Sequence, residues 1–496
     1  MPRKYQTSIG SFTRKSTFFW AAVGATVGLA NLWQFPYLAS RHGGGLFIVL
    51  YLACLLLVTL PLMVTETVFG RHSRHGIVLA ISGYVKTAGS HPAWRVLGPV
   101  SIVAAFLVLS FTVVFGGIVL AYVFIGAAGQ LRGATEAQAS AVFADLVANP
   151  GNYRELMAWH FFFLLLLLLV SGRGVVRGVE RSVRFLVPLM LLLMVTLFVL
   201  AAWYGQLGSG ASRVLEARPE QLGLDSLRAA FFHAFYTLGL GMGVWTIFGA
   251  YAAPGTRLKR SVLAVVLTDT LVAIVAGIMM FALTRAGLES ERGFSLLFVS
   301  LPVTLAQLPY GQLVTAAVFL MVMLVVWTTA LALFEPVIGW LREWAGAPRR
   351  MSVLLVGTGV WLAGLVSLFS FNLWTGYHPG GVSPFRWVEL LAGGVLVPLA
   401  GIMLALFTGW CISRRYAGDL LGRAVPAVHR YWYWALKLVV PVAVALIGLQ
   451  YTVFSLADVC ENGNASIWCG GDPAEVEGAG AQNEPMEGRI RYDEQP

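Results

Sequence analysis

The feature that most constrains how this chain can fold is a series of continuous apolar stretches, each long enough to cross a lipid bilayer. A membrane-spanning helix needs roughly 20 mostly apolar residues, and only helices or closed barrels satisfy all of their backbone hydrogen bonds in lipid. The stretches are continuous rather than alternating, which favours helices. We therefore predict an all-α integral membrane protein with about eleven transmembrane helices, near residues 17–40, 46–70, 96–126, 157–172, 183–204, 227–250, 261–284, 310–341, 351–373, 387–411 and 431–456.

The charged residues follow the pattern of a membrane protein whose N-terminus is cytoplasmic. Only 12% of the residues are charged, against roughly a quarter in soluble domains. Lysine and arginine gather in alternate loops, as they do on the cytoplasmic side of membranes. These loops explain the net charge of +10, so we expect no nucleic-acid partner and a multi-pass protein of the plasma (inner) membrane. The basic residues are Arg3, Lys4, Arg14, Lys15, Arg71, Arg74, Arg173, Arg177, Arg181, Arg257, Lys259, Arg260, Arg349, Arg350, Arg414, Arg415, Arg423 and Arg430.

Composition divides the chain into three parts. Residues 1–16 form a basic cytoplasmic segment without the short apolar core of a signal peptide, and residues 17–456 form the transmembrane domain. Residues 457–496 carry nine Asp or Glu and two Arg, a net charge of −7 (2 − 9), which predicts a disordered extracytoplasmic tail. Cys54 and Cys411 lie in apolar spans, whereas Cys460 and Cys469 in the tail could form a disulfide in an oxidising compartment.

Small residues interrupt two of the predicted spans. The first span contains the run GATVGLAN at residues 24–31, and the sixth contains YTLGLGMG at residues 236–243. If spans one to five and six to ten are two repeats, these are the first helices of the two halves. Paired breaks of this kind indicate a binding site at the membrane midplane, because unwound backbone frees carbonyls for cations and amides for anions. Gly24 and Gly28 alone would also fit a helix-packing motif.

The residues around both breaks resemble the neurotransmitter:sodium symporter family, which includes the bacterial leucine transporter. The resemblance lies in AAVGATVGLANLWQFPYLASRHGGG at residues 21–45, in PLM at 61–63 with Glu66 and Gly70, in TLGLGMG at 237–243 and in FVSLP at 298–302, and it extends to about Leu456. It implies two inverted five-helix repeats with broken helices 1 and 6, and sodium-coupled symport by alternating access. A twelfth helix, common in the family, is not expected here.

Carried over by position, the resemblance implies two sodium sites. Sodium is a hard cation that prefers oxygen ligands. The ligands of the first site would be Thr26, Asn31, Thr237 and Asp269. The second site would use carbonyls of Gly24, Val27 and Val325 and the hydroxyls of Thr328 and Thr329. The two adjacent threonines could instead bond back to the preceding helical turn.

Asp269 would bring a negative charge to the first sodium site. An ionised residue at mid-membrane depth costs roughly 2.5–3.5 kcal/mol on insertion scales, so it should face a polar cavity, and the sequence offers no obvious Arg partner. In the family, Asn is common at this position and some members need chloride. The acidic residue is similar to that of chloride-independent bacterial members, which implies two sodium ions and no chloride requirement.

Three positions near the predicted pocket depart from the family pattern. Thr112 stands where the third helix normally places a Tyr against the substrate carboxylate, and Gly239 replaces a small polar residue, which widens the pocket. His233 replaces a Gln near the outer gate. A lone histidine in a membrane is more often a packing residue than a proton carrier, so proton coupling through His233 is the lesser alternative.

The family's two gates are altered as well. Gln34 replaces the outer-gate Arg opposite a retained acidic residue, Glu389, so this gate could close by hydrogen bonding but not by an ion pair. Tyr236 would be the aromatic lid over the substrate. At the cytoplasmic gate, Glu343 matches the family's acidic residue, whereas the N-terminal segment offers no identifiable Arg partner.

The predicted substrate is a small amino acid or a similar solute. Gly28 occupies the position that carries Asp in monoamine members, which leaves space for a carboxylate, whereas the loss of the Tyr at Thr112 argues the other way. An amine or zwitterion without an α-carboxylate is therefore the alternative substrate. The walls are largely apolar. The implied substrate-binding residues are Ala25, Thr26, Gly28, Ala30, Val108, Thr112, Tyr236, Thr237, Gly239, Met242, Thr329 and Leu333.

Three other functional classes were weighed against a transporter. A membrane enzyme is not expected, because the ionisable residues at membrane depth are too few and scattered for a catalytic group. A solute sensor that does not transport would use the same binding residues and stays open as an alternative. A sodium channel fits less well, because broken helices suit alternating access.

Overall fold

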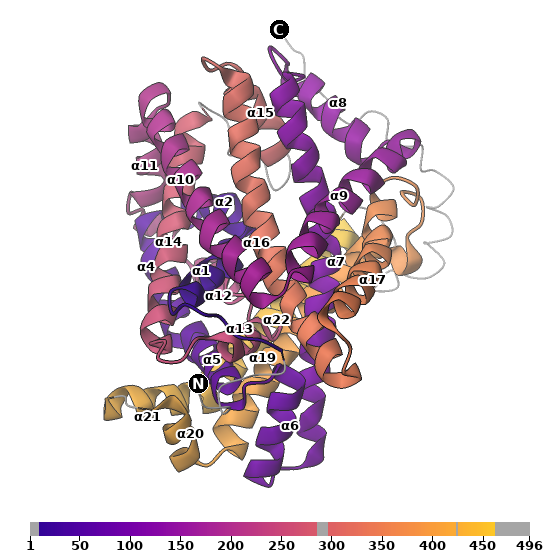
Figure 1. Ribbon diagram of the computed structural model, residues 1–496. Coiled ribbons are helices and arrows are strands. Elements are labelled where there is room, and N and C mark those ends of the chain that lie inside the picture. The colour runs from indigo at the N-terminus through magenta and orange to yellow at the C-terminus, as the bar shows by residue number, and fades with distance from the viewer. Residues whose placement is uncertain (1–8, 285–295, 423–424, 462–496) are drawn as a thin grey trace, which may run out of the picture.

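The protein is an all-helical bundle in which the long helices cross between two opposite faces (Figure 1). The structure is a computed structural model that describes residues 9–284, 296–422 and 425–461, with side chains described as far as Thr452. In this part of the chain the only β-structure is an isolated bridge between Gly44 and Ala217. Of the acidic segment predicted from residue 457 on, only residues 457–461 fall in the described part, where they continue the last helix. Cys469 lies outside it.

The described residues form 22 α-helices, joined in places by short 3₁₀ and π-helical turns. Their bounds are α1 Thr17–Thr26, α2 Leu29–Leu32, α3 Gln34–Arg41, α4 Gly45–Cys54, α5 Leu60–Ser73, α6 Ile77–Ala88, α7 Leu97–Ala128, α8 Glu136–Val147, α9 Tyr153–Gly172, α10 Arg181–Tyr204, α11 Leu207–Leu215, α12 Leu224–Thr237, α13 Val244–Tyr251, α14 Leu258–Leu283, α15 Leu301–Ala306, α16 Gly311–Ala345, α17 Arg349–Phe371, α18 Pro384–Glu389, α19 Val397–Leu406, α20 Arg414–Leu421, α21 Pro426–Trp434 and α22 Val440–Glu461.

Within the described ranges, nine helical segments are long and apolar enough to cross a membrane. The two interrupted spans add to these nine, so the predicted total of about eleven is confirmed. The nine segments are Gly45–Ser73, Pro92–Ala128, Pro150–Gly172, Val175–Tyr204, Leu258–Leu283, Gly311–Ala345, Arg349–Phe371, Pro384–Cys411 and Pro426–Thr452.

The first span is broken between α1 and α2. Val27 (ψ 98°) and Gly28 (φ −117°, ψ 179°) leave the helical conformation, so α1 ends at Thr26 and α2 begins at Leu29. The side chain of Asn31 stabilises the break, because its Oδ1 accepts a hydrogen bond from the Gly28 amide at 3.0 Å. An amide side chain thus provides the acceptor that a continuous helix would supply from its backbone.

The sixth span is broken between α12 and α13, where glycine residues adopt left-handed conformations. The φ angles of Gly239, Gly241 and Gly243 are +59°, +77° and +71°. Only glycine adopts such angles without steric cost, so the glycine-rich run ends α12 at Thr237 and lets α13 begin at Val244. Both breaks lie where the glycine pattern predicts them.

Helix α13 is interlocked with α5. A Cβ on Gly70 of α5 would collide with the carbonyl oxygen of Thr246, and one on Gly249 of α13 would collide with the carbonyl oxygen of Thr67. Glycine therefore allows backbone-to-backbone contact between the two helices. The buried Glu66 of α5 adds a hydrogen bond, because its Oε1 accepts the amide of Gly243 at 3.0 Å.

Two faces of the molecule orient the description of the site. The α8 face carries α8 and α15, at the top of Figure 1, and the α6 face carries α6, α20 and α21, at the bottom. The broken spans α1–α3 and α12–α13 lie between these faces, in the middle of the bundle, next to α14 and α16.

Candidate functional site

Three side chains from different helices meet beside the two helix breaks. Asn31 of α2, Thr237 of α12 and Asp269 of α14 are all buried. The Asn31 Nδ2 donates to Asp269 Oδ1 at 2.9 Å, and the Thr237 hydroxyl lies 3.2 Å from Asp269 Oδ2 and 3.3 Å from Asn31 Oδ1. The structure thus brings together three of the four residues predicted for the first sodium site. The carbonyl of the fourth, Thr26, lies close by, since a Cβ placed on Gly28 would be 3.7 Å from it and 4.0 Å from Asn31 Oδ1.

The Asp269 carboxylate is held by neutral groups. Besides Asn31 and Thr237, the hydroxyl of Tyr51 in α4 lies 3.4 Å from Oδ2. None of the hydrogen-bond partners recorded for this carboxylate in the described residues is a cation. A buried carboxylate without a paired charge is costly at membrane depth, and a cation bound by these oxygens would compensate it. Nothing in the sequence indicates that Tyr51 contacts Asp269.

A second group of oxygens lies between α1 and α16. The Thr329 hydroxyl lies 3.4 Å from the Val27 carbonyl at the end of α1 and 3.1 Å from the Val325 carbonyl. The Thr328 hydroxyl bonds back to Leu324 and Val325 at 3.0 and 3.1 Å. Both hydroxyls act as donors in these bonds, which leaves their oxygen lone pairs free to face a cation.

Gly24 allows α1 to lie close to this second group. A Cβ at Gly24 would come within 3.0 Å of the Thr328 Cβ and 2.9 Å of a Val187 methyl group. A larger residue would push α1 away from α16. The residues predicted for the second sodium site therefore lie together in the structure. Both threonine hydroxyls also donate to carbonyls of their own helix, as the alternative prediction stated.

Several of the predicted substrate-binding residues lie at or beside the two helix breaks. Gly28 lies at the first break, and a Cβ there would be 3.9 Å from the Thr329 hydroxyl and 3.7 Å from the Thr26 carbonyl. Met242 closes part of the second break, with its methyl carbon 3.4 Å from a Cβ placed on Gly239. Ala25 and Ala30 belong to the first break and are half-buried, and Leu333 of α16 is buried.

Thr112 does not reach across the site. Its hydroxyl donates to the carbonyl of Val108, one turn earlier in α7, at 2.7 Å. The shorter side chain thus uses its proton within its own helix, as threonines in apolar helices commonly do. A hydroxyl held in this way offers a substrate carboxylate no proton without first breaking that bond.

Tyr236, predicted to be the aromatic lid, is bonded to the π-helical turn between α18 and α19. Its hydroxyl donates to the carbonyl of Gly393, in the π-helical turn between α18 and α19, at 2.6 Å. The ring of Phe232 packs on Tyr236 with centroids 4.5 Å apart, and the Tyr451 ring stacks on Phe232 at 5.5 Å and 4°. Three aromatic side chains therefore lie together next to the break between α12 and α13.

The predicted outer gate has different partners from those expected. Glu389 accepts from Arg386 at 2.6 Å and from the Tyr451 hydroxyl at 2.8 Å, and no hydrogen bond to Gln34 is found in the described residues. Gln34 instead lines a cleft of about 350 Å³ together with Phe232 and Tyr451. Arg386 could have been noticed as the basic residue three positions before Glu389, whereas nothing in the sequence indicates Tyr451.

His233 is buried among aromatic rings. Its ring lies 5.2 Å from Phe35 and 5.4 Å from Tyr51, centroid to centroid, and neither ring nitrogen has a hydrogen-bond partner. The side chain is only 1% exposed. Through Tyr51 it lies one residue away from Asp269, so it is close to the first oxygen group without belonging to it.

A buried ion pair closes the bundle toward the α6 face. Arg349 of α17 donates to Glu335 of α16 at 2.5 Å, and these side chains are 11% and 0% exposed. Glu335 also accepts from Ser171 at 2.7 Å and from Tyr251 at 2.8 Å. Arg349 further donates to the Ser171 carbonyl at 2.8 Å. The pair thus joins α9, α13, α16 and α17, and no sequence pattern indicates it.

The N-terminal segment lies across the same face. Phe12 packs edge-on against Tyr251 with centroids 5.5 Å apart, and its amide donates to the Tyr251 carbonyl at 2.7 Å. Glu180 accepts from the hydroxyls of Thr13 and Thr17 at 2.9 and 2.7 Å. These contacts hold α1 against α10 and α13.

Glu343 pairs with a histidine rather than with an N-terminal arginine. Its Oε1 lies 2.9 Å from His75 Nδ1, and the amide of Gly76 donates to both carboxylate oxygens at 3.1 and 3.2 Å. The hydrogen bond to Glu343 raises the pKa of His75 above its ordinary value, although partial burial opposes this. His75 follows the second span directly, so its basic character was visible in the sequence, but its partner was not.

Comparisons with known proteins agree with this architecture. The model of the sodium:neurotransmitter symporter family matches residues 10–139 and 142–462. The chain is similar to the uncharacterized sodium-dependent transporter YhdH of Bacillus subtilis, with 30% identity over 88% of this chain and 96% of that one. It is also similar to the sodium-dependent dopamine transporter of Bos taurus, with 23% identity over 87% of this chain and 67% of that one. The crystal structure of MhsT in complex with L-phenylalanine matches with a TM-score of 0.78 and 28% identity, over 89% of this chain and 99% of that one.

Proposed function

Because this chain belongs to the sodium:neurotransmitter symporter family and is a sodium-dependent symporter with the leucine-transporter fold, we propose that it imports a small amino acid by alternating access. Two sodium ions would bind at the two oxygen groups beside the helix breaks, and the solute would lie between them. The chain is a multi-pass membrane protein. We propose that its α6 face is cytoplasmic, in keeping with the basic loops, and that residues 1–16, 17–456 and 457–496 are its cytoplasmic, transmembrane and extracytoplasmic parts.

The observation that carries this proposal is the convergence of Asn31, Thr237 and Asp269 at a point where backbone is unwound. Carboxylate, amide and hydroxyl oxygens suit a hard cation such as sodium. The second group, around Val27 and Thr329, likewise offers only oxygen. Since Asp269 supplies a fixed negative charge, we propose that transport needs no chloride.

An amino acid is the favoured solute because Gly28 leaves open space beside the first break. The match to MhsT, which was crystallised with L-phenylalanine, supports an apolar or aromatic amino acid. The hydroxyl bond of Thr112 to its own helix favours the alternative, an amine or zwitterion without an α-carboxylate, for which Asp269 would be the only anion near the first site.

The test is uptake by the purified full chain in proteoliposomes, with and without a sodium gradient, after a thermal-stability screen of amino acids, amines and betaines in sodium and in choline. A ligand that binds the folded state raises its stability by mass action. We expect an apolar amino acid to stabilise the protein only in sodium and to accumulate only with inward sodium. Accumulation that is equal in choline would refute sodium coupling, and sodium-dependent stabilisation without accumulation would identify a sensor.

A matched pair of variants ties this result to the second oxygen group. Thr329→Ala removes a hydroxyl that faces Val27, whereas Thr196→Ala removes an exposed hydroxyl that bonds only to its own helix, at Leu192. We expect the first variant to weaken the sodium dependence of uptake and the second to leave it unchanged.

Proton coupling through His233 is the second candidate feature, because its buried ring nitrogens have no partner. Uptake measured against pH in His233→Gln tests it. An unchanged pH profile would leave His233 as a packing residue, and a flattened profile would support a proton step.

A further inference from the structure

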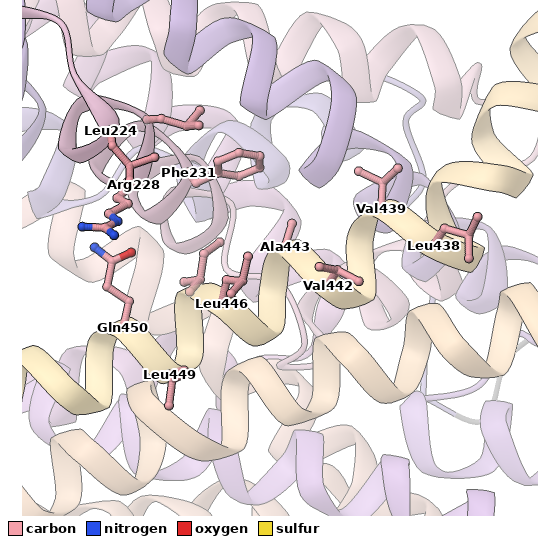
Figure 2. A pocket seen from close by; sticks show the side chains of 12 residues that line it. Leu224, Arg228, Phe231, Leu438, Val439, Val442, Ala443, Leu446, Leu449 and Gln450 are labelled. Atoms are coloured by element: carbon pink, nitrogen blue, oxygen red, sulfur yellow. The ribbon is translucent and has the colours of Figure 1, made fainter.

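A long groove runs between α12 and α22 on the outside of the bundle. Its volume is about 840 Å³, within the range of small-molecule binding sites. Ten of its twelve lining residues are apolar. Figure 2 shows Val442 and Leu446 along α22, Val439 just before its start, and Leu224 and Phe231 of α12 above them. Val442 and Leu446 are each 62% exposed, so the described residues leave most of the surface of these two apolar side chains uncovered.

The groove has one polar end. Arg228 of α12 and Gln450 of α22 are its two polar lining residues, and Figure 2 shows their side chains pointing toward each other. The Arg228 guanidinium also lies 2.8 Å from the carboxylate of Asp225, and the two side chains are 45% and 77% exposed. Asp225 lines the adjoining cleft, which shares Gln450 with the groove, so a cation and an anion lie next to each other beside the polar end of the groove.

The dimensions match one lipid acyl chain. From Leu438 to Gln450 the groove follows the last two residues of the π-helical turn Ala435–Val439 and the first eleven of α22, and at a helical rise of 1.5 Å per residue this is about 18 Å. The hydrocarbon core of a bilayer is roughly 30 Å thick, so one leaflet contributes about 15 Å. The polar end contains Arg228, near the start of α12, and Gln450, midway along α22. The apolar lining from Leu438 to Leu449 leads up to it, so a lipid headgroup and its tail would lie in the order that the groove presents.

We propose that this groove binds a phospholipid with a primary ammonium group, such as phosphatidylethanolamine. Its acyl chain lies along α22, its phosphate accepts hydrogen bonds from Arg228 and Gln450, and its ammonium donates to Asp225. Arginine recognises phosphate through paired, charge-assisted hydrogen bonds, and the adjacent carboxylate disfavours a purely anionic headgroup. Phosphatidylcholine carries no N–H donor, so the carboxylate distinguishes the two zwitterionic lipids.

The two helices that line the groove, α12 and α22, also carry residues of the predicted outer closure. Helix α12 ends one residue after the lid Tyr236, and Tyr451, which bonds to Glu389, follows Gln450 directly. A lipid wedged between α12 and α22 therefore contacts both helices that carry Tyr236 and Tyr451. This inference does not depend on the identity of the transported solute, so it can fail while the proposed transport stands.

The experiment is native mass spectrometry of the delipidated full chain, titrated with phosphatidylethanolamine, phosphatidylcholine or phosphatidylglycerol in detergent. We expect phosphatidylethanolamine to bind at least several-fold more tightly than the other two, and Arg228→Gln to weaken it by roughly tenfold. Arg154→Gln, an exposed arginine of α9 outside the groove, is the matched control. Val442→Trp fills the groove with a side chain at an exposed position and should also reduce binding.

Several outcomes would overturn the proposal. Equal retention of the three lipids, tighter retention of phosphatidylglycerol, or unchanged binding in both Arg228→Gln and Val442→Trp would each show that the groove does not recognise this headgroup. Association of two copies of the chain that disappears in Val442→Trp would assign the groove to a protein interface instead. Size-exclusion profiles establish that each variant is folded before it is titrated.

Discussion

Removing Arg349 should destabilise the protein more than any other single change at the α6 face. Arg349→Met leaves Glu335, which is 0% exposed, as a buried carboxylate whose remaining partners are the neutral hydroxyls of Ser171 and Tyr251. Two unit charges about 4 Å apart attract by about 4 kcal/mol at an effective dielectric constant of about 20. Breaking one side of a buried pair costs about 3–5 kcal/mol in measured cases. We expect a loss of that size in the free energy of unfolding.

The double variant Arg349→Met/Glu335→Gln distinguishes a charge effect from a packing effect. Without either charge, the amide oxygen at position 335 can still accept from one of the two hydroxyls of Ser171 and Tyr251, and its NH2 group can donate to the other, so the loss should fall to less than half that of Arg349→Met. Replacing both members of a buried pair is often close to neutral. Arg228→Met, in an exposed pair, should cost no more than about 1 kcal/mol.

Chemical denaturation of the four proteins in one detergent, followed by tryptophan fluorescence, gives the required differences. A double variant at least as unstable as Arg349→Met would show that the arginine acts through its apolar stem and not through its charge. A loss under about 1 kcal/mol for Arg349→Met would refute the buried-charge reasoning altogether.

Three further predictions concern the site and its gates. Asp269→Asn should make uptake depend on chloride or abolish it, since the fixed charge is lost; full uptake in gluconate medium would contradict the chloride prediction. Tyr236→Phe removes a neutral hydrogen bond to Gly393 worth about 0.5–1.5 kcal/mol, so the apparent affinity for solute in equilibrium binding should fall by about two- to tenfold, and an unchanged affinity would mean that this bond does not retain the solute. The pKa of His75 is raised by Glu343, so their pair stabilises the fold fully below the ordinary histidine pKa of about 6.5 and loses this effect as pH rises through the raised value. The stability difference between wild type and His75→Asn should therefore shrink with rising pH in denaturant titrations, and a difference that grows would reverse the assignment.

The breaks in the first and sixth spans could be predicted because glycine determines them locally. Gly239, Gly241 and Gly243 take backbone angles that other residues avoid, so these glycines by themselves predict where α12 ends. The meeting of Asn31 with Asp269 is a different matter, since 238 residues separate them. It was predictable only because the chain resembles a family in which these positions lie together.

The partners of the gates could not be predicted for a related reason. Hydrophobic periodicity tells which face of a helix is buried, but it does not tell which helix covers it. Tyr451 and Glu389 lie on helices that meet only in the folded bundle, and the basic partner that the resemblance implies for Glu389 is replaced by Gln34 in this chain. By its sequence, Arg349 is one of several loop arginines expected on the cytoplasmic face. Its burial depends on how α17 begins against α9 and α16, which the sequence does not show.

The interlocking of α13 with α5 has a mechanical consequence. The two backbones touch at Gly70 and Gly249. Neither helix can slide or rotate against the other without a steric clash, so the pair behaves as one rigid unit. Helix α1 has no such backbone contact at Gly24, where an added Cβ would meet only side-chain atoms of Val187 and Thr328. Movement of α1 relative to α16 therefore requires only that side chains shift, whereas α13 and α5 move together as one rigid unit.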